Sequence, residues 1–491
     1  MPNTGSQHRT QLEGIARRVM EERGFLTDFS PQVLAELGRI AGAAASSDAA
    51  VRDLRDLLWC SIDNDDSLDL DQLSVAQPAS GGATRILVAV ADVDALVKNG
   101  SAIDGHARQN TTSVYTPAVI FPMLPERLST DLTSLNADKD QLAIVFEMET
   151  GADGSVGAAE VYCATVRNHA KLAYNSVAAW LENRGPVPAA IAGVAGLAEN
   201  LRLQYAVAQK MKEIRHQHGA LDLETVQART VFEGDAVRDL VPETRNSAKD
   251  IIEDLMISAN GVSARFLEAK RYPSLRRVVR TPKRWDRIVE LARERGGQLP
   301  SEPDSKALNQ FLVSARSADA VTFPELSLSV IKLLGPGEYV VEYPGEEPVG
   351  HFGLAVRDYA HATAPNRRYP DLLSHRILKA AMVSGALPYR RDELEALAKH
   401  CTDQEDAAKK VERQVEKSSA ALLLESKIGQ QFDALVTGAA DKGTWVRLMQ
   451  YPVEGKLMNP PPGVDVGRRL RVQLVHTDAE RGFIDFKTVG G

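Results

Sequence analysis

The segment Ser61–Leu73, SIDNDDSLDLDQL, restricts the fold more than any other part of the chain. It places five aspartates within nine positions and interleaves them with Ile62, Leu68 and Leu70. A solvated acidic loop needs no apolar residues, whereas a loop that is fixed to a core does. Two unit charges about 4 Å apart repel by about 1 kcal/mol in water and by several times more when partly buried. The fold must therefore anchor this segment and offset its charge.

Three structures can accommodate the aspartates Asp63, Asp65, Asp66, Asp69 and Asp71. The first is a solvated acidic loop whose carboxylates point apart. The second is a calcium loop, but its sixth and twelfth positions, counted from Asp63, hold Leu68 and Ser74 instead of the glycine and glutamate that it requires. The third is a magnesium or manganese site for phosphoryl chemistry, because hard cations take carboxylate oxygens and leave room for a phosphate oxygen. The calcium loop fails, and the other two remain open.

Composition excludes several classes of protein. A net charge of −8 over 491 residues argues against a basic surface for duplex binding, although a local basic channel remains compatible. Three scattered cysteines form neither a disulfide framework nor a zinc site. No apolar run approaches the roughly 20 residues of a membrane span, and the first residues lack a signal-peptide pattern. We therefore expect a cytoplasmic protein without a membrane partner. We also expect the protein to be monomeric, although composition does not bear on this point.

Residues 1–50 are predicted to form a small helical module. Leu12, Ile15 and Val19 have helical spacing, and a second helix begins with Ser30 as N-cap and Pro31 at its first position. In that second helix Val33, Leu34 and Leu37 are expected to face inward. Two short helices with a tight turn suit a helix-turn-helix-like module or a simple cap on the next domain. The pattern does not separate these two alternatives.

Residues 51–428 mix strand and helix signals without a repeat, which predicts an α+β domain. Strands are expected at 85–93, 141–149 and 161–172, and amphipathic helices at 198–219, 249–270 and 371–383.

Residues 429–491 change character and predict a five-stranded barrel of the OB type, because about five short strands alternate with glycine-containing and charged turns. Arg468, Arg469 and Arg471 cluster there, and Trp445 lies on a predicted strand. An aromatic residue beside arginines suits single-stranded nucleic acid, whose bases stack while cations follow the phosphates. As a single residue, Trp445 fits a position in the barrel core at least as well.

Four blocks of the sequence, in order along the chain, resemble the ribonuclease II/ribonuclease R (RNB) family of exoribonucleases. The blocks are IDNDDSLDLDQ at 62–72, the segment 88–125, IIEDLMISAN at 251–260, and HFGLAVRDYAHATAPNRRYPDLLSHRIL at 351–378. The C-terminal barrel occupies the place of the family's RNA-binding OB domain. The resemblance thus covers roughly residues 51 to 491, and is closest to ribonuclease II.

This resemblance implies an RNB catalytic domain and a magnesium-dependent 3′→5′ exoribonuclease, with manganese as a substitute cation. Such an enzyme degrades single-stranded RNA processively to nucleoside 5′-monophosphates in RNA decay or processing. The alternative is a catalytically impaired RNB-fold regulator that only binds RNA.

The resemblance also implies roles for single residues in the acidic segment. Asp63, Asp69 and Asp71 match three of the four family aspartates that hold magnesium, and Asp69 and Asp71 are expected to be catalytic. The fourth aspartate falls at Gln72, a neutral amide that offers one oxygen and no charge. Either Asp65 or Asp66 compensates, or one metal ion binds more weakly.

Outside the acidic segment, Arg367 matches the family arginine that grips phosphate near the scissile bond, which its planar fork suits. Arg368 is a second candidate or a structural ion-pair partner. Tyr115 matches an aromatic that stacks on bases at the 3′ end. Glu253 and Asn260 lie where family members contact RNA, although helix packing explains them equally well.

The N-terminal part departs from the family, whose members usually carry two cold-shock barrels before the catalytic domain. Only about 50 residues precede the acidic segment here, and their pattern is helical. We expect the RNA entrance to be built from the helical module and the C-terminal barrel. A more open entrance of this kind would tolerate partly double-stranded substrates.

Overall fold

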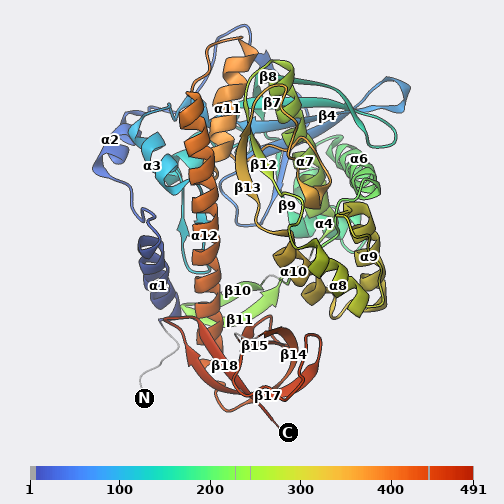
Figure 1. Cartoon of the computed structure of the whole chain (residues 1–491). Coiled ribbons are helices and arrows are strands. Elements are labelled where there is room, and N and C mark those ends of the chain that lie inside the picture. Colours follow the sequence, from blue (N-terminus) through green and yellow to red (C-terminus); the bar gives the residue numbers. More distant parts are fainter. Residues whose placement is uncertain (1–6, 227, 244, 441–442, 490–491) are drawn as a thin grey trace.

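The computed structural model describes residues 7–226, 228–243, 245–440 and 443–489 (Figure 1). A mixed sheet with covering helices and a separate C-terminal barrel confirm the α+β fold. The helices are α1 (His8–Glu22), α2 (Pro31–Arg39), α3 (Ala102–Asn110), α4 (Tyr174–Leu181), α5 (Ala189–Ala192), α6 (Leu197–Gln217), α7 (Ser247–Ala269), α8 (Trp285–Glu294), α9 (Ser305–Ala318), α10 (Phe323–Leu334), α11 (Tyr369–Met382) and α12 (Arg391–Glu425). The short helical turns are η1 (Ser80–Gly82), η2 (Val93–Ala95), η3 (Arg127–Leu132) and η4 (Phe352–Leu354). None of the described helices is long and apolar enough to cross a membrane.

The strands of the main sheet follow the order β1-β8-β7-β4-β3-β2-β9. Their bounds are β1 (Arg52–Asp53), β2 (Cys60–Asp63), β3 (Gln72–Pro78), β4 (Thr84–Ala91), β7 (Asp140–Thr150), β8 (Val156–Arg167) and β9 (Ala170–Ala173). The edge pairs β1–β8 and β2–β9 are parallel, and the inner pairs are antiparallel. Residues 86–91 of β4 are buried on both faces, which explains their unbroken apolar run. Helices α6 and α7 pack together and against this sheet. The strands and helices expected between residues 85 and 383 are present, except that the strand expected at 161–172 is divided between the end of β8 and β9.

Charge pairs fix helix α11 to the sheet side of the domain. Arg376 forms ion pairs with Asp94 at 3.0 Å and Asp104 at 2.8 Å, and Lys379 pairs with Asp92 at 3.0 Å. The Arg376 side chain is only 3% exposed, so these pairs lie in a low-dielectric environment. Because α11 begins directly after Arg368, the network also fixes the segment that enters this helix.

The two N-terminal helices do not form a helix-turn-helix-like unit, and that expectation is wrong. Helix α1 packs along α12, and its Leu12, Ile15 and Val19 join the hydrophobic cluster of α12 and the barrel. Helix α2 packs against α3, and Val33 joins the cluster of the main sheet. Ser30 caps α2 as expected, accepting a hydrogen bond from the Val33 amide, but Leu34 is 53% exposed and does not face inward. The helices cover the neighbouring domains, which is the alternative that the pattern left open.

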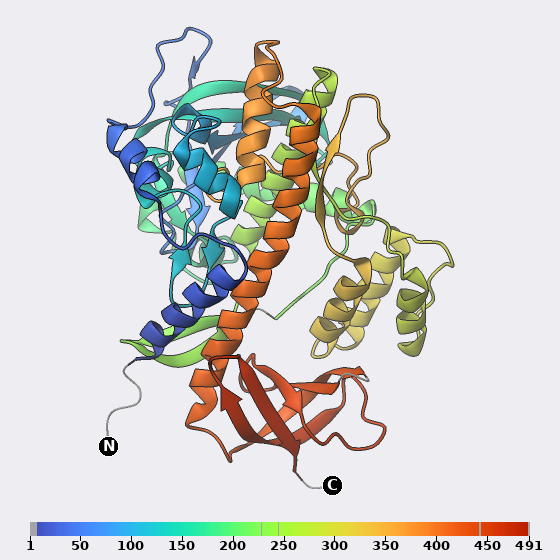
Figure 2. The ribbon, with the colours of Figure 1, turned by 60° about the vertical axis from the view of Figure 1, so that its left-hand side comes forward.

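The C-terminal barrel is closed, as predicted, with five strands in the order β14-β15-β16-β18-β17. They are β14 (Gln431–Ala440), β15 (Gly443–Leu448), β16 (Glu454–Leu457), β17 (Arg469–Asp478) and β18 (Phe483–Thr488). The long helix α12 runs from the catalytic domain to this barrel, where it contacts β17 and β18 (Figure 2). The barrel is thereby tied to the rest of the molecule by a rigid element.

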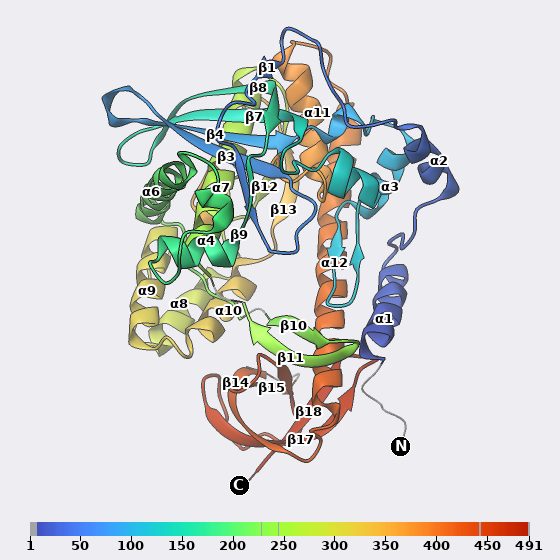
Figure 3. The same ribbon diagram turned by 180° about the vertical axis from the view of Figure 1, so that it is seen from behind.

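Two features near the barrel were not predicted. Helices α8, α9 and α10 form a unit with its own core, which includes Trp285, Phe311 and Phe323. Strands β10 (Ala228–Glu233) and β11 (Ala236–Pro242) form a hairpin between the catalytic domain and the barrel, as Figure 3 shows from behind. Small two-stranded sheets are also formed by β5 (Val114–Tyr115) with β6 (Ile120–Phe121) and by β12 (Ser274–Val278) with β13 (Glu338–Glu342).

Candidate active site

The acidic segment links the end of β2 to the start of β3 and is anchored by buried apolar side chains. Ile62 is 4% and Leu70 is 1% exposed, whereas Leu68 is 60% exposed and borders a cavity. The Ser134 hydroxyl accepts a hydrogen bond from the Leu70 amide at 3.0 Å and donates one to the Leu68 carbonyl at 2.8 Å. The loop is therefore fixed as expected, although Leu68 does not contribute to the core.

Asp71 lies at the centre of the site and contacts the segment that carries Arg367. Its Oδ1 accepts a hydrogen bond from the Asn366 amide at 2.9 Å, and its Oδ2 accepts one from Arg367 Nε at 3.0 Å. Burial raises the pKa of Asp71 to about 7, although the Arg367 guanidinium opposes this shift. The Arg367 side chain is 41% exposed and thus reaches the open part of the site. The structure thus brings Asp71, expected to be catalytic, into contact with Arg367, expected to grip the phosphate.

Asp69 and Asp63 lie beside this pair. The Tyr115 hydroxyl donates a hydrogen bond to Asp69 Oδ2 at 2.9 Å, and burial raises the pKa of Asp69. Asp63 Oδ1 accepts a hydrogen bond from the Ser67 hydroxyl at 2.9 Å. Tyr115 is 38% exposed, and its backbone amide donates to Glu412 of α12, so its ring is held at the edge of the cavity.

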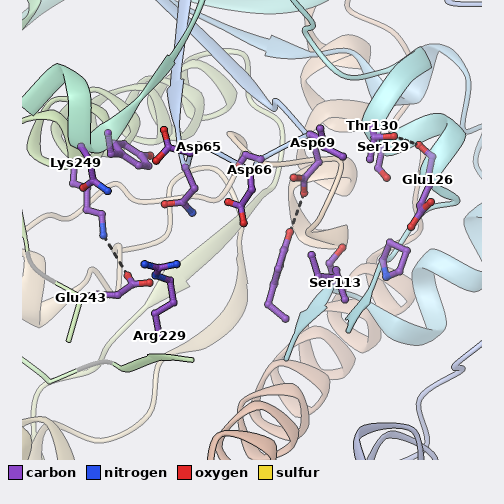
Figure 4. Close-up of a pocket in the computed structure, with 18 of the residues that line it drawn as sticks. Asp65, Asp66, Asp69, Ser113, Glu126, Ser129, Thr130, Arg229, Glu243 and Lys249 are labelled. Carbon is purple, nitrogen blue, oxygen red and sulfur yellow. Dashed lines mark hydrogen bonds and ion pairs between the residues drawn. The ribbon is translucent and has the colours of Figure 1, made fainter. Parts of the chain in front are cut away.

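Two adjoining cavities of about 660 and 680 Å³ meet at this site. Both are bordered by Asp69, Tyr115 and Tyr174. Figure 4 shows the first of them, with Asp65, Asp66 and Asp69 on one side and residues of the β10–β11 region opposite. Together the two cavities are large enough for an extended polymer segment that carries polar and planar groups.

Arg368, Asn260 and Glu253, which were also expected to contact RNA, border the second cavity. In the structure, each of these side chains forms a hydrogen bond or an ion pair with another part of the protein. Arg368 donates to Asp371 at 2.7 Å, which agrees with its alternative role as an ion-pair partner. Asn260 is 2% exposed and accepts a hydrogen bond from the Ala362 amide at 2.8 Å, and Glu253 pairs with Arg245 at 2.9 Å. Their contacts with RNA stay predictions.

Trp445 lies on the outer face of the barrel and not in its core, so the core assignment is wrong. Its neighbours Thr444, Val446 and Leu448 alternate with it and are buried, which directs the indole outward. The ring covers Gly438 and Gly443 and stays half-buried. Trp445 borders neither cavity, and its role in RNA binding stays a prediction.

The oxygen donors of the site suit a hard divalent cation. Asp63, Asp69 and Gln72 border one cavity and offer carboxylate and amide oxygens, which magnesium and manganese prefer. Within the described ranges, no three His, Cys, Asp or Glu side chains are grouped closely enough to ligate one ion. The oxygens of Asp71 bond instead to Asn366 and Arg367. The chemistry of the donors fits magnesium, and the assignment of ligands stays a prediction.

Sequence reasoning missed the basic side chains that face the acidic loop. Arg229 on β10 and Lys249 at the start of α7 border the first cavity, and Lys249 pairs with Glu243 at 3.3 Å. The run VFEGDAVRDLV contains a signal for this hairpin, because a Gly-Asp turn separates two segments that carry valine and phenylalanine, residue types common in strands. Nothing in the sequence places that hairpin opposite the acidic segment.

Comparison with known proteins agrees with this architecture. Residues 51–384 match the RNB domain family, and residues 430–489 match the C-terminal S1 domain of RNase II-type exonucleases. Ribonuclease R of Vibrio parahaemolyticus is 31% identical over 423 residues, which are 82% of this chain and 49% of that relative. This chain thus spans about half the length of the curated relatives that it matches.

Solved structures show the same fold. The apo form of Mycoplasma genitalium RNase R superposes with a TM-score of 0.87 at 22% identity, covering 96% of this chain and 77% of that one. Yeast Ssd1, described as a pseudonuclease, superposes with a TM-score of 0.72 at 15% identity, covering 91% of this chain and 55% of that one. Closer kinship to ribonuclease II than to ribonuclease R stays a prediction, as do the exact domain boundaries. The RNB match extends over more than half of the chain, which therefore belongs to the RNB family.

Proposed function

We propose that this chain is a magnesium-dependent 3′→5′ exoribonuclease that hydrolyses single-stranded RNA processively to nucleoside 5′-monophosphates in RNA decay or processing. The observation that carries the proposal is the contact between Asp71 and Arg367, which lie 296 positions apart in the sequence. It joins the acidic segment to an arginine at one cavity that Tyr115 also borders. Acids, a phosphate-binding cation and a stacking aromatic together suit the end of an RNA chain.

The residues of the site have different roles in this reaction. Arg367 donates a hydrogen bond from Nε to Asp71. Both terminal nitrogens of its guanidinium group therefore remain to bind two phosphate oxygens. The same guanidinium offsets the negative charge that develops on the phosphate as the bond breaks. The Tyr115 ring stacks on the terminal base while its hydroxyl orients Asp69. Asp63, Asp69 and Asp71 would hold magnesium, which would supply activation of the attacking water.

An RNA-binding regulator without catalysis is the second candidate. Gln72 in place of a family aspartate favours it, and the pseudonuclease Ssd1 has the same fold, so the fold alone does not decide activity.

Digestion of 5′-labelled single-stranded RNA separates the two candidates. With magnesium or manganese we expect the label to remain on full-length RNA until it passes to a short end product, and chelation with EDTA should stop the reaction. Single-stranded DNA of the same sequence serves as the control and should persist, because proteins distinguish RNA through its 2′-hydroxyl. Retention of intact RNA in a gel shift, with no cleavage in either metal, would establish the regulator instead.

Tyr115 provides a separate test of binding at the 3′ end. Replacing Tyr115 with alanine should weaken the binding of a short RNA in EDTA by about 1–3 kcal/mol, the range for loss of one base-stacking ring. Tyr115→Phe keeps the ring and loses only the bond to Asp69, so it should bind RNA nearly as well as the unmodified protein. Fluorescence anisotropy of a 3′-labelled oligonucleotide measures both. Equal affinities for all three proteins would remove Tyr115 from the binding site.

Tolerance of partly double-stranded substrates, a monomeric state and a cytoplasmic location stay predictions.

A further inference from the structure

The segment Ala362–Arg368, which carries Arg367 to the cavity, is held by side chains of the adjoining helix α11, of helix α7 and of the acidic segment. Asp371 accepts hydrogen bonds from the amides of Thr363 and Ala364, each at 2.8 Å. The amides of Ala362 and Asn366 donate to Asn260 and Asp71. These partners are all acceptors, so they fix the N–H groups of the segment and leave its carbonyl groups to be satisfied by donors.

Gln72 provides such a donor near the start of the segment. Its Nε2 donates a hydrogen bond to the carbonyl of Thr363, across 291 positions of sequence. Because a carbonyl only accepts hydrogen bonds, the nitrogen end of the amide must face it. A carboxylate at this position would set one acceptor against another and would leave the Thr363 carbonyl without this partner. Glutamine in place of the family aspartate therefore supplies a hydrogen bond to the arginine segment that a carboxylate would not form.

We infer that Gln72 is a positioning residue for Arg367 and that it acts through the Thr363 carbonyl. Its amide donates a hydrogen bond to that carbonyl, which an aspartate carboxylate would not do. Gln72 opens β3, directly after Asp71, so one stretch of chain holds the arginine segment at two points: Asp71 at Asn366 and Arg367, and Gln72 at Thr363. The role of Arg367 in gripping phosphate rests on the proposed function, whereas the link between Gln72 and the segment does not. On this inference Gln72 is no sign of a degenerate site.

Three substitutions test the inference. Gln72→Glu keeps the length and adds a charge, and Gln72→Met keeps the approximate volume and removes the donor without adding charge. Gln77→Glu, at the other end of β3, makes the same chemical change away from the cavity and is the control. Hydrogen–deuterium exchange of peptides covering residues 360–370 should rise in both Gln72 variants and remain unchanged in Gln77→Glu. Thermal unfolding of each variant checks that the whole protein remains folded.

RNA binding in EDTA gives a second readout, independent of metal and of cleavage. Each Gln72 variant should bind single-stranded RNA on the order of tenfold more weakly, equivalent to about 1.4 kcal/mol. Arg367→Ala combined with Gln72→Met should bind no more weakly than Arg367→Ala alone, because residues that act through one another are not additive. A ligand role predicts the opposite pattern: unchanged exchange and RNA affinity, with tighter manganese binding by Gln72→Glu in electron paramagnetic resonance titrations.

That opposite pattern, or unchanged exchange in Gln72→Met alone, would overturn the inference. If the unmodified protein does not cleave RNA, the proposed function fails, but hydrogen exchange and manganese titration still decide the role of Gln72.

Discussion

Replacing Asp71 with asparagine is expected to abolish RNA cleavage while leaving RNA binding close to that of the unmodified protein. Asp71 is 2% exposed, and asparagine has nearly the same volume, so the fold can retain it. The amide keeps one oxygen to accept a hydrogen bond but loses the charge that offsets the Arg367 guanidinium and that, on the proposed function, would contribute to cation binding. Removing one preorganised polar contact at a reaction centre costs about 100- to 1,000-fold in kcat, and we expect at least that loss.

Single-turnover cleavage with magnesium and RNA affinity in EDTA measure the two halves of this prediction. Asp56→Asn is the matched control, because Asp56 is an exposed aspartate that borders neither cavity of the site. It should cleave RNA at the normal rate. Cleavage by Asp71→Asn at a rate near that of Asp56→Asn would refute the catalytic role of Asp71.

Local pattern predicted the anchoring of the acidic segment correctly, because alternation of apolar and acidic residues is a property of the segment itself. Ile62 and Leu70 are buried as that alternation requires. Leu68 follows the same pattern and yet faces a cavity, since its environment depends on where the β10–β11 hairpin and the segment around Tyr115 lie. Exposure of one side chain within a predicted motif is thus a tertiary property.

Contacts between distant residues could not be derived from composition or periodicity. The pair Asp71–Arg367 was expected only through the resemblance of two sequence blocks to one family, and the structure brings it together. The donor role of Gln72 was not expected, because an amide can supply either an oxygen or an N–H group and the sequence does not show which one is used. For Trp445, the alternation of side chains along the strand decides whether the indole faces the barrel core or the outside, but only once the register of the strand is known. The sequence does not show that register.

The helices α8–α10 show a related limit. Their apolar residues have helical spacing, but the sequence does not show which surface of the molecule they contact. In the structure, Arg447 on the outer face of β15 donates from Nε to Glu325 of α10 at 2.8 Å. The Glu325 side chain is 4% and the Arg447 side chain 19% exposed. Together with the contacts of α12 on the opposite strands, this pair holds the barrel against the catalytic part of the chain.

Replacing Arg447 with alanine is therefore expected to destabilise the attachment of the barrel to α10 strongly. Loss of one partner leaves the Glu325 carboxylate buried and uncompensated, which costs about 3–5 kcal/mol in comparable buried pairs. Burial of the pair carries a desolvation cost even when both partners are present, because Glu325 Oε2 is buried and has no hydrogen-bond partner among the described residues. We expect a lower thermal midpoint and faster hydrogen exchange in peptides from α10 and β15, with little change in the main sheet.

Two further variants show whether the charge pair itself is responsible. The double variant Glu325→Leu with Arg447→Met removes both charges and keeps apolar volume at the contact, so it should recover most of the lost stability, as apolar replacements of buried ion pairs often do. Arg287→Ala breaks an exposed pair with Glu290 on α8 and should cost no more than about 1 kcal/mol. If Arg447→Ala is as mild as Arg287→Ala, the contact with α10 contributes little to the position of the barrel, and its other contacts, including those with α12 and α1, hold it in place.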